Sequence, residues 1–406
     1  MTSRGITATR SRQMLLVWGL LVVAANLRAP LTGVGPVLDQ IQADRGLSPT
    51  TAGLLTTLPL LAFAALSPLV PRLTMRRSPE RVLAWALVVL AVGVGLRWVP
   101  TVPGLFVGTT LIGAGAAVGN VLLPSLIKRD FPERVGFLTA AYATVMGGVA
   151  AVASGIAVPL SEVAPGGWRT GVGCWLLLVV VGIVLWLPQT RRSTRLTTEA
   201  PRRARLPWSS PLAWAVTAFM GLQSLGFYVV ITWLPQILHD TGDTASADAG
   251  WLLFLFQAVA VVTSLAVPAV MRSKTDKRML AVVSSAVLLA GYLGLVILPG
   301  WAVVWTIVLG LGGGACLVLA LAFLGLRAAD AAGAGALSAM AQSIGYLLAA
   351  IGPVLLGALH SVTTGWQAPL VVMCVAAAAQ VVVAVVAGRG TVIDSAASVA
   401  AKQRTD

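Results

Sequence analysis

Continuous apolar runs of membrane-spanning length recur along this chain, and they constrain its fold more than any other feature. Of the 406 residues, 57% are hydrophobic and only 10% are charged, whereas soluble domains carry about 25% charged residues. A run of about 20 apolar residues forms a helix long enough to cross a bilayer. The alternating polar and apolar pattern of an outer-membrane barrel is absent. We therefore predict an all-α integral membrane protein.

The apolar runs, separated by Gly, Pro and charged residues, predict twelve membrane spans. Because this number is even, both termini lie on one side of the membrane. The expected spans cover residues 14–38, 50–71, 80–98, 102–127, 135–160, 168–188, 210–238, 248–271, 278–298, 301–326, 334–358 and 365–387.

The positively charged residues are distributed unequally between the two sides of the membrane. All of the 28 Lys and Arg residues lie in the two tails or near the even-numbered loops, except Arg28, Arg45, Arg97 and Arg169. Positive charge marks the cytoplasmic face, so both termini are expected in the cytoplasm of a cell whose inner (plasma) membrane holds the protein. This distribution accounts for the net charge of +14, and no nucleic-acid partner is needed to explain it.

The chain contains an internal repeat. Gly167-Trp168-Arg169, before the sixth span, matches Gly365-Trp366-Gln367, before the twelfth, at an offset of 198 residues, and other matches share this register. We expect an N-terminal six-helix bundle (1–188), a cytoplasmic basic linker (189–209) and a C-terminal six-helix bundle with a short tail (210–406).

One charge lies at membrane depth, in the run Asn26-Leu27-Arg28-Ala29-Pro30. A charge near the centre of a membrane helix costs about 2.5–3.5 kcal/mol on insertion scales and usually faces a protein interior or a wet cavity. The planar fork of Arg28 suits a carboxylate-like or phosphate-like anion. The alternative is a structural Arg that satisfies helix carbonyls or pairs with a carboxylate. Because no Asp or Glu lies within the core of another span, we favour a substrate anion.

Helical geometry selects the neighbours of Arg28. Thr32 is four residues on and shares its face, while Asn26 points about 200° away in a regular helix. Pro30, Gly33 and Gly35 can interrupt that helix and bring Asn26 to the site. Asp39 lies about 16 Å further out along the helix, where it is a candidate gating residue or a solvated helix end.

Polar and aromatic residues of other spans complete the expected substrate site. Singly, each is better explained as packing between helices, but together with Arg28 they describe a small polar pocket with aromatic walls. These residues are Asn120, Tyr142, Tyr228, Thr232, Trp233, Gln257, Gln342 and Tyr346.

Two six-span halves around a basic loop resemble the major facilitator superfamily over the whole chain. The loop from Pro71 to Arg77 lacks the Gly and Asp that the superfamily usually carries there, and its Arg72 and Arg76 are candidate gating residues. This short loop, the Asn26–Pro30 segment and the following Gly33-Val34-Gly35-Pro36 resemble the cyanate permease and nitroimidazole transporter family. The resemblance implies a midplane site between the halves and a monomeric protein.

The expected function is alternating-access secondary transport of a small anionic or polar organic solute. The family resemblance implies a cyanate-like anion or a nitroimidazole-like heterocycle. A multidrug or antibiotic efflux transporter of the same superfamily is the alternative, and a sensor that has lost transport is a third class. We expect no enzyme activity, no catalytic residue, no cofactor and no metal site, because no nucleophile–base pair, phosphate loop or metal-ligand cluster is visible.

The coupling of transport is also constrained, because proton-coupled transporters often titrate a carboxylate or histidine at membrane depth and no span core carries one. We expect uniport, anion exchange, or proton co-transport governed by the substrate and its Arg. Uptake into proteoliposomes under an imposed pH gradient tests this. Strong proton coupling that survives Asp39→Asn would contradict the prediction.

Overall fold

The computed structural model describes residues 3–191, 207–242, 246–271, 276–329 and 331–393. Among these residues, twelve helices are long and apolar enough to cross a membrane, which confirms the all-helical prediction. Each expected span has its counterpart, with ends that differ by a few residues apart from the first, which is longer and interrupted.

The first half of the chain supplies six of these spans, the first of them built from several short helices. Its elements are α1 (Ser3–Asn26), α2 (Ala29–Thr32), η1 (Gly35–Val37), α3 (Leu38–Arg45), α4 (Pro49–Leu66), η2 (Ser67–Leu69), α5 (Val70–Arg76), α6 (Pro79–Leu96), α7 (Val102–Asp130), η3 (Pro132–Arg134), α8 (Val135–Val163), α9 (Trp168–Gly173), α10 (Trp175–Trp186) and η4 (Leu187–Arg191).

The second half supplies the other six spans, and their helices are longer and more regular. Its elements are α11 (Pro211–Gly242), α12 (Ser246–Met271), α13 (Arg278–Ile297), η5 (Pro299–Trp301), α14 (Ala302–Leu326), α15 (Ala331–Thr363) and α16 (Gln367–Ala387).

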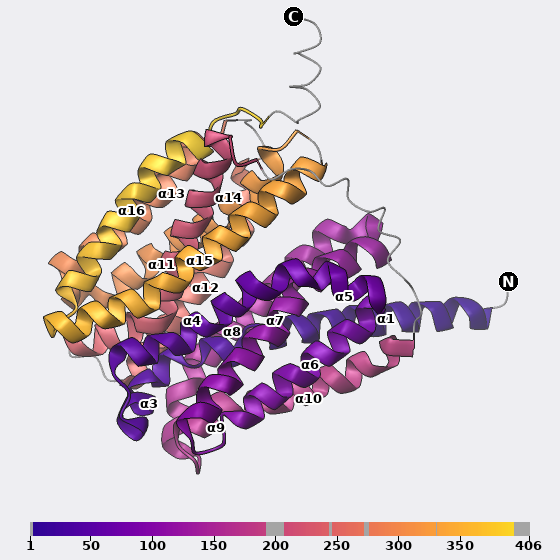
Figure 1. Cartoon of the computed structure of the whole chain (residues 1–406), viewed down its shortest axis with the longest axis horizontal. Helices are drawn as coiled ribbons and strands as arrows, with labels where there is room; N and C mark the ends of the chain where they lie inside the picture. The colour runs from indigo at the N-terminus through magenta and orange to yellow at the C-terminus, as the bar shows by residue number, and fades with distance from the viewer. Residues whose placement is uncertain (1–2, 192–206, 243–245, 272–275, 330, 394–406) are drawn as a thin grey trace, which may run out of the picture.

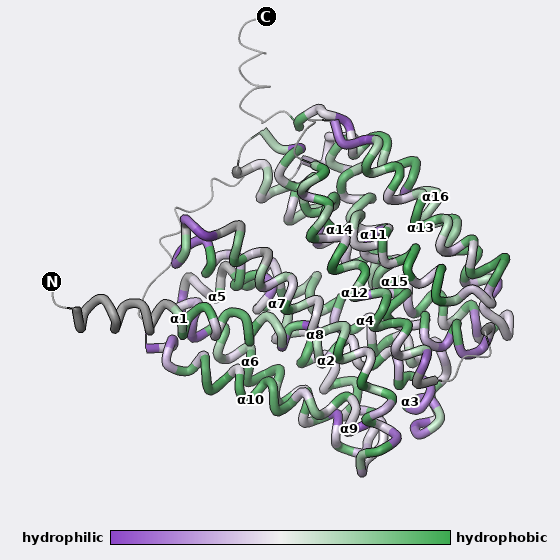
Figure 2. Tube along the Cα trace, turned by 180° about the vertical axis from the view of Figure 1, so that it is seen from behind, coloured by the Kyte–Doolittle hydropathy of each residue, from purple (hydrophilic) through white to green (hydrophobic). Residues whose placement is uncertain are grey.

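The helices form two bundles, α1–α10 and α11–α16, tilted against each other (Figure 1). The bundles meet where α4 packs along α15, α8 along α12, and η1 and α3 against α11. Hydrophobic residues follow the helices, and hydrophilic stretches gather toward their ends (Figure 2). We call the end of the molecule where α5, α7 and α14 terminate the basic end, and the end where α3 terminates the far end.

The first span breaks beside Arg28, as its Pro and Gly residues predict. α1 stops at Asn26, and Arg28 leaves helical geometry with φ −121° and ψ −38°. Pro30 has no N–H to donate to the carbonyl of Asn26, and Pro36 has none for the carbonyl of Thr32. The span therefore continues as α2, η1 and α3.

Neighbouring helices satisfy the carbonyl groups that this break releases. The Ser154 hydroxyl of α8 donates to the Thr32 carbonyl at 3.1 Å. The buried Arg97, at the end of α6, donates from Nη1 to the Pro30 carbonyl. Non-helical backbone at membrane depth persists only where protein groups or water satisfy it, so these contacts hold the broken segment.

Glycines bring the two bundles into backbone contact at the far end. A Cβ on Gly53 of α4 would lie 2.7 Å from the Pro353 carbonyl oxygen of α15, and one on Gly357 would lie 2.6 Å from the Pro49 carbonyl oxygen. One on Gly35 would lie 2.0 Å from the Ile231 carbonyl oxygen. The far end is therefore closed by contacts that leave no room for side chains.

We expect Gly53→Ala to weaken this contact and lower thermal stability by about 1–3 kcal/mol, the usual cost of overpacking. Gly95→Ala is the matched control, because a Cβ there meets nothing within 4 Å and alanine favours a helix by about 0.8–1 kcal/mol over glycine. Thermal unfolding of both variants in detergent measures the difference. Equal melting temperatures would contradict the close packing of α4 on α15.

Candidate substrate site

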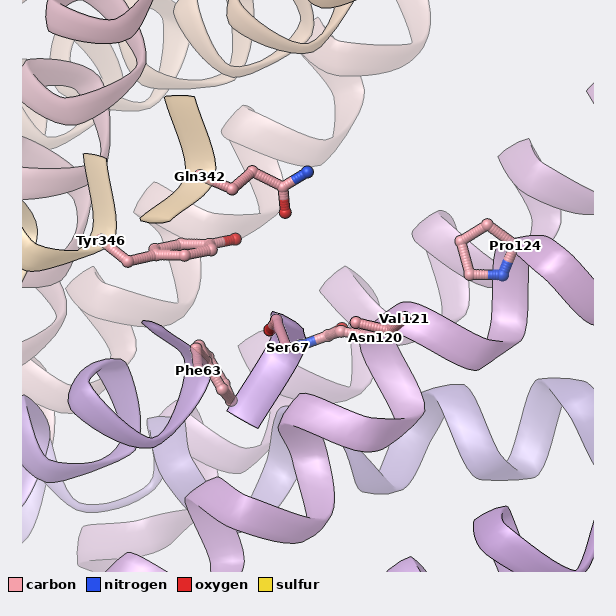
Figure 3. Close-up of a pocket in the computed structure, with 7 residues that line it drawn as sticks. All are labelled: Phe63, Ser67, Asn120, Val121, Pro124, Gln342 and Tyr346. Atoms are coloured by element: carbon pink, nitrogen blue, oxygen red, sulfur yellow. The ribbon is translucent and has the colours of Figure 1, made fainter. Parts of the chain in front are cut away.

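A cavity of about 240 Å³ lies between the two bundles. Phe63 of α4 and Asn120 of α7 line it from the first bundle, and Gln342 and Tyr346 of α15 face them from the second (Figure 3). The other lining residues are Ser67, Val121 and Pro124. Since α4 and α7 run toward the basic end from Phe63 and Asn120, the cavity lies on the basic side of the closed far end.

Arg28 holds a charge that has no anionic partner in the described part of the chain. Its Nη1 donates to the Tyr228 hydroxyl of α11 at 3.0 Å, and its guanidinium lies 5.7 Å from the ring centre of Phe227 and 5.6 Å from that of Tyr228. Among the described residues, no carboxylate forms an ion pair with it. Arg28 is not itself among the residues that line the cavity, but Tyr346, which does line it, interacts electrostatically with the guanidinium.

Two other partly buried arginines of the described chain do have carboxylate partners. Arg129, at the end of α7, contacts both Glu80 and Asp130 at 2.7 Å. Arg169 contacts Asp44 at 2.8 Å. A charge taken out of water is costly unless it is paired, and Arg28 has only a neutral phenol and aromatic rings as neighbours.

Four of the expected site residues lie either at the cavity or on Arg28 itself. Asn120, Gln342 and Tyr346 line the cavity, and Tyr228 binds the guanidinium directly. Gln342 donates to Ser338 on its own helix at 2.7 Å, and Tyr346 packs edge-on against Phe63 with ring centres 5.8 Å apart. The arrangement offers a cation, phenols and amides around an aromatic wall.

Two expected residues of the first span serve helix packing instead. The Asn26 side chain is fully buried and donates from Nδ2 to the carbonyls of Val22 at 2.9 Å and Leu178 at 3.1 Å. Although the helix breaks, the amide therefore binds α10 and does not line the cavity. The Thr32 hydroxyl donates to the Ala150 carbonyl of α8 at 3.0 Å.

Residues expected from the later spans also make contacts between helices. Thr232 donates to Thr56 across the two bundles at 2.9 Å, and Gln257 donates to Ser154 across them at 2.6 Å. Trp233 donates to the Pro353 carbonyl at 2.9 Å and is fully buried. Tyr142 is half-buried on α8 and packs against the core, outside the cavity lining.

The expected gating residues lie at opposite ends. Asp39 is in the first turn of α3 at the far end, and its buried Oδ1 has no hydrogen-bond partner among the described residues. Arg76 is exposed in the last turn of α5 at the basic end. The side chain of Arg72 lies outside the described residues.

Sequence reasoning missed Phe63, Ser67, Val121, Pro124 and Phe227. Four of these are apolar, and nothing in the pattern of an apolar span distinguishes a residue that faces a cavity from one that faces lipid. Ser67 carries a weak signal, because it precedes Pro68 where α4 ends. Their roles emerge only when α4, α7, α11 and α15 are placed together.

Comparison with known proteins defines the family. The model of the Major Facilitator Superfamily matches residues 20–353. The 2-nitroimidazole transporter of Escherichia coli (strain K12) is 42% identical over 379 residues, which cover 93% of this chain and 96% of that protein. The cyanate transport protein CynX of the same organism is 32% identical over 362 residues, covering 86% and 90% of the two chains.

A solved structure agrees in fold. The inward-facing, occupied structure of a bacterial homolog of the human lysosomal transporter Spinster superimposes with a TM-score of 0.74 at 14% identity, covering 92% of this chain and 94% of that one. The chain belongs to the Major Facilitator Superfamily. It is a transporter related to the 2-nitroimidazole transporter and to CynX, and its family consists of transporters and not of enzymes.

Asn26, which bonds to helix carbonyls, and Asn120, which lines the cavity, allow helix packing and substrate binding to be tested separately. We expect Asn26→Ala to lower thermal stability by about 1 kcal/mol, because two carbonyls lose their shared donor, without changing substrate affinity. Asn120→Ala should leave stability within about 0.5 kcal/mol and weaken substrate uptake. Melting temperature and uptake KM, measured on both variants, test the division. The reverse pattern would show that Asn26 belongs to the site.

Proposed function

We propose that this protein is an alternating-access secondary transporter that moves a small anionic or polar organic solute, and that Arg28 is its anion-binding residue. The observation that supports the proposal is the partly buried guanidinium at the interface of the two bundles, whose contacts among the described residues are with neutral groups. A substrate anion would serve as its counter-ion. The protein would work as a monomer in the inner (plasma) membrane, with both termini in the cytoplasm.

Electrostatics favours this role for Arg28. A guanidinium remains charged in proteins, and at membrane depth a lone charge is unfavourable. An anion that reaches it gains Coulomb attraction, which is several-fold stronger there than in bulk water because the effective dielectric constant is lower. The Tyr228 hydroxyl engages only Nη1, which leaves other donors of the fork for a bidentate contact.

The cavity favours a small and flat solute. Phe63 and Tyr346 offer an aromatic edge and face, and the amides of Asn120 and Gln342 provide both hydrogen-bond donors and acceptors. The relatives named for 2-nitroimidazole and for cyanate lead us to propose a nitroimidazole-like heterocycle or a cyanate-like anion as the substrate.

The packing supports alternating access. The bundles touch through glycines at the far end, while the cavity lies on the side of the basic end. With the basic loops in the cytoplasm, this arrangement corresponds to an inward-facing state. Separation of α4 from α15 at Gly53, together with release of the Thr232–Thr56 and Gln257–Ser154 bonds, would open the site outward.

A thermal-shift screen of small anions and heterocycles tests the proposed site, with cyanate and 2-nitroimidazole as first probes. A ligand at about 100 times its Kd stabilises the folded state by about 2.7 kcal/mol. We expect this shift in wild type, its loss in Arg28→Ala, and a weaker shift in Arg28→Lys, since a point charge lacks the fork. Arg169→Ala is the control, because Arg169 pairs with Asp44 at the far end.

Uptake into proteoliposomes and drug-resistance assays distinguish an anion site at Arg28 from the alternatives. A compound that stabilises wild type and the Arg28→Ala variant equally, with equal uptake, would reject the anion site. Expression that raises resistance to a panel of lipophilic drugs, without uptake of small anions, would favour multidrug efflux instead.

A further inference from the structure

A buried arginine, Arg97, contacts the break in the first span. Its side chain is only 1% exposed, although it follows the last residue of α6. Nη1 donates to the Pro30 carbonyl, Nε donates to the Thr109 hydroxyl of α7 at 3.1 Å, and Nη2 has no hydrogen-bond partner among the described residues. In the described part of the chain, no carboxylate forms an ion pair with Arg97.

The Pro30 carbonyl is one that the broken helix leaves available. In a regular helix it would accept from the N–H of Val34, but that N–H bonds with the Leu31 carbonyl at 3.5 Å. Pro30 is two residues from Arg28, within the short turn of α2 that fixes the direction of the Arg28 backbone. The N–H groups of Leu31 and Thr32 both donate to the Arg28 carbonyl, at 2.9 Å and 3.0 Å. The contact at Pro30 therefore bears directly on the placement of Arg28.

Thr109 in turn orients Arg97. Its hydroxyl is buried, donates to the Leu105 carbonyl of its own helix at 2.7 Å, and accepts from Nε of Arg97. The hydroxyl thus uses its proton toward Leu105 and one lone pair toward Nε of Arg97. With Nε held in this way, Nη1 of Arg97 is directed at Pro30. Thr109 of α7 thus contacts Arg97, and Arg97 contacts Pro30 of α2, through named donor and acceptor atoms.

We propose that Arg97 is a positioning residue that holds the broken segment through the Pro30 carbonyl and so presents Arg28 to the substrate. The inference rests on the proposed anion-binding role of Arg28. Arg97 itself does not line the cavity and acts through the backbone of residues 28–32. Loss of its bond frees this turn, and a binding group misplaced by about 1 Å costs up to about a hundredfold.

The first test measures the segment without any ligand, by hydrogen exchange of the amides of residues 27–37. We expect exchange to accelerate about tenfold in Arg97→Ala and by a smaller factor in Thr109→Val, which keeps the fold but removes the acceptor for Nε. Thr109→Ser keeps the hydroxyl and should behave as wild type. Arg327→Ala is the matched control for a buried arginine, because Arg327 is 2% exposed and donates to the carbonyls of Ala387 and Gly388 at 3.0 Å, at the end of α16.

The second test measures apparent Kd for cyanate and 2-nitroimidazole by thermal shift. We expect Arg97→Ala to raise it about tenfold to a hundredfold, Arg97→Lys to recover part of the loss, and Arg327→Ala to leave it unchanged. Full recovery of affinity in Arg97→Lys while residues 27–37 still exchange fast would assign the effect to charge and overturn the inference. Unchanged exchange in both Arg97→Ala and Thr109→Val would overturn it as well.

The two readouts separate this inference from the proposed function. If neither probe binds wild type, while exchange of residues 27–37 responds to Arg97 and Thr109 as described, the proposed substrates fail and the anchoring of the segment stands. If both probes bind through Arg28 but exchange does not respond, the proposed function stands and Arg97 has no positioning role.

Discussion

Backbone carbonyls released by a broken membrane helix must find donors within the protein, and the site of this transporter depends on that constraint. Pro36 removes the N–H that would meet the Thr32 carbonyl, and the Ser154 hydroxyl of α8 donates to that carbonyl. The Pro30 carbonyl loses its helical donor, because the Val34 N–H bonds with Leu31, and Arg97 at the end of α6 donates to it instead. The break is what turns Arg28 out of helical geometry and toward Tyr228 of the other bundle. In a continuous helix the backbone carbonyls at this depth would be satisfied within the helix, so polar side chains of neighbouring helices would not be needed there.

The same segment joins the local break to the closure of the whole molecule. The Thr32 carbonyl accepts from Ser154, and Ser154 accepts from Gln257 of the second bundle. Gly35, a few residues on, lies against the backbone of α11. Opening the far end would therefore disturb the groups that hold the broken segment, so the proposed substrate binding at Arg28 and the proposed movement of the bundles share contacts.

Much of the fold was predictable, because membrane helices satisfy their own backbone hydrogen bonds and are recognised in a sequence by the length and continuity of their apolar runs. The sequence also singled out Arg28, because a charge at membrane depth is costly, and the structure places it against Tyr228 at the interface of the bundles, while its role in binding stays a prediction. The cavity wall was not. Phe63 and Val121 look like lipid-facing residues, and the bond from Arg97 to Pro30 joins residues 67 positions apart. Asn26 and Trp233 were candidates by residue type, but their partners are backbone carbonyls of neighbouring helices.

The central claim is that the counter-ion missing from Arg28 is the substrate. A structure of the wild-type protein with a stabilising compound bound tests it most directly. We expect the anionic or polar group of that compound within hydrogen-bond distance of the Arg28 guanidinium, with its ring or flat face against Phe63 and Tyr346. A compound bound elsewhere, with Arg28 still held only by Tyr228, would contradict it.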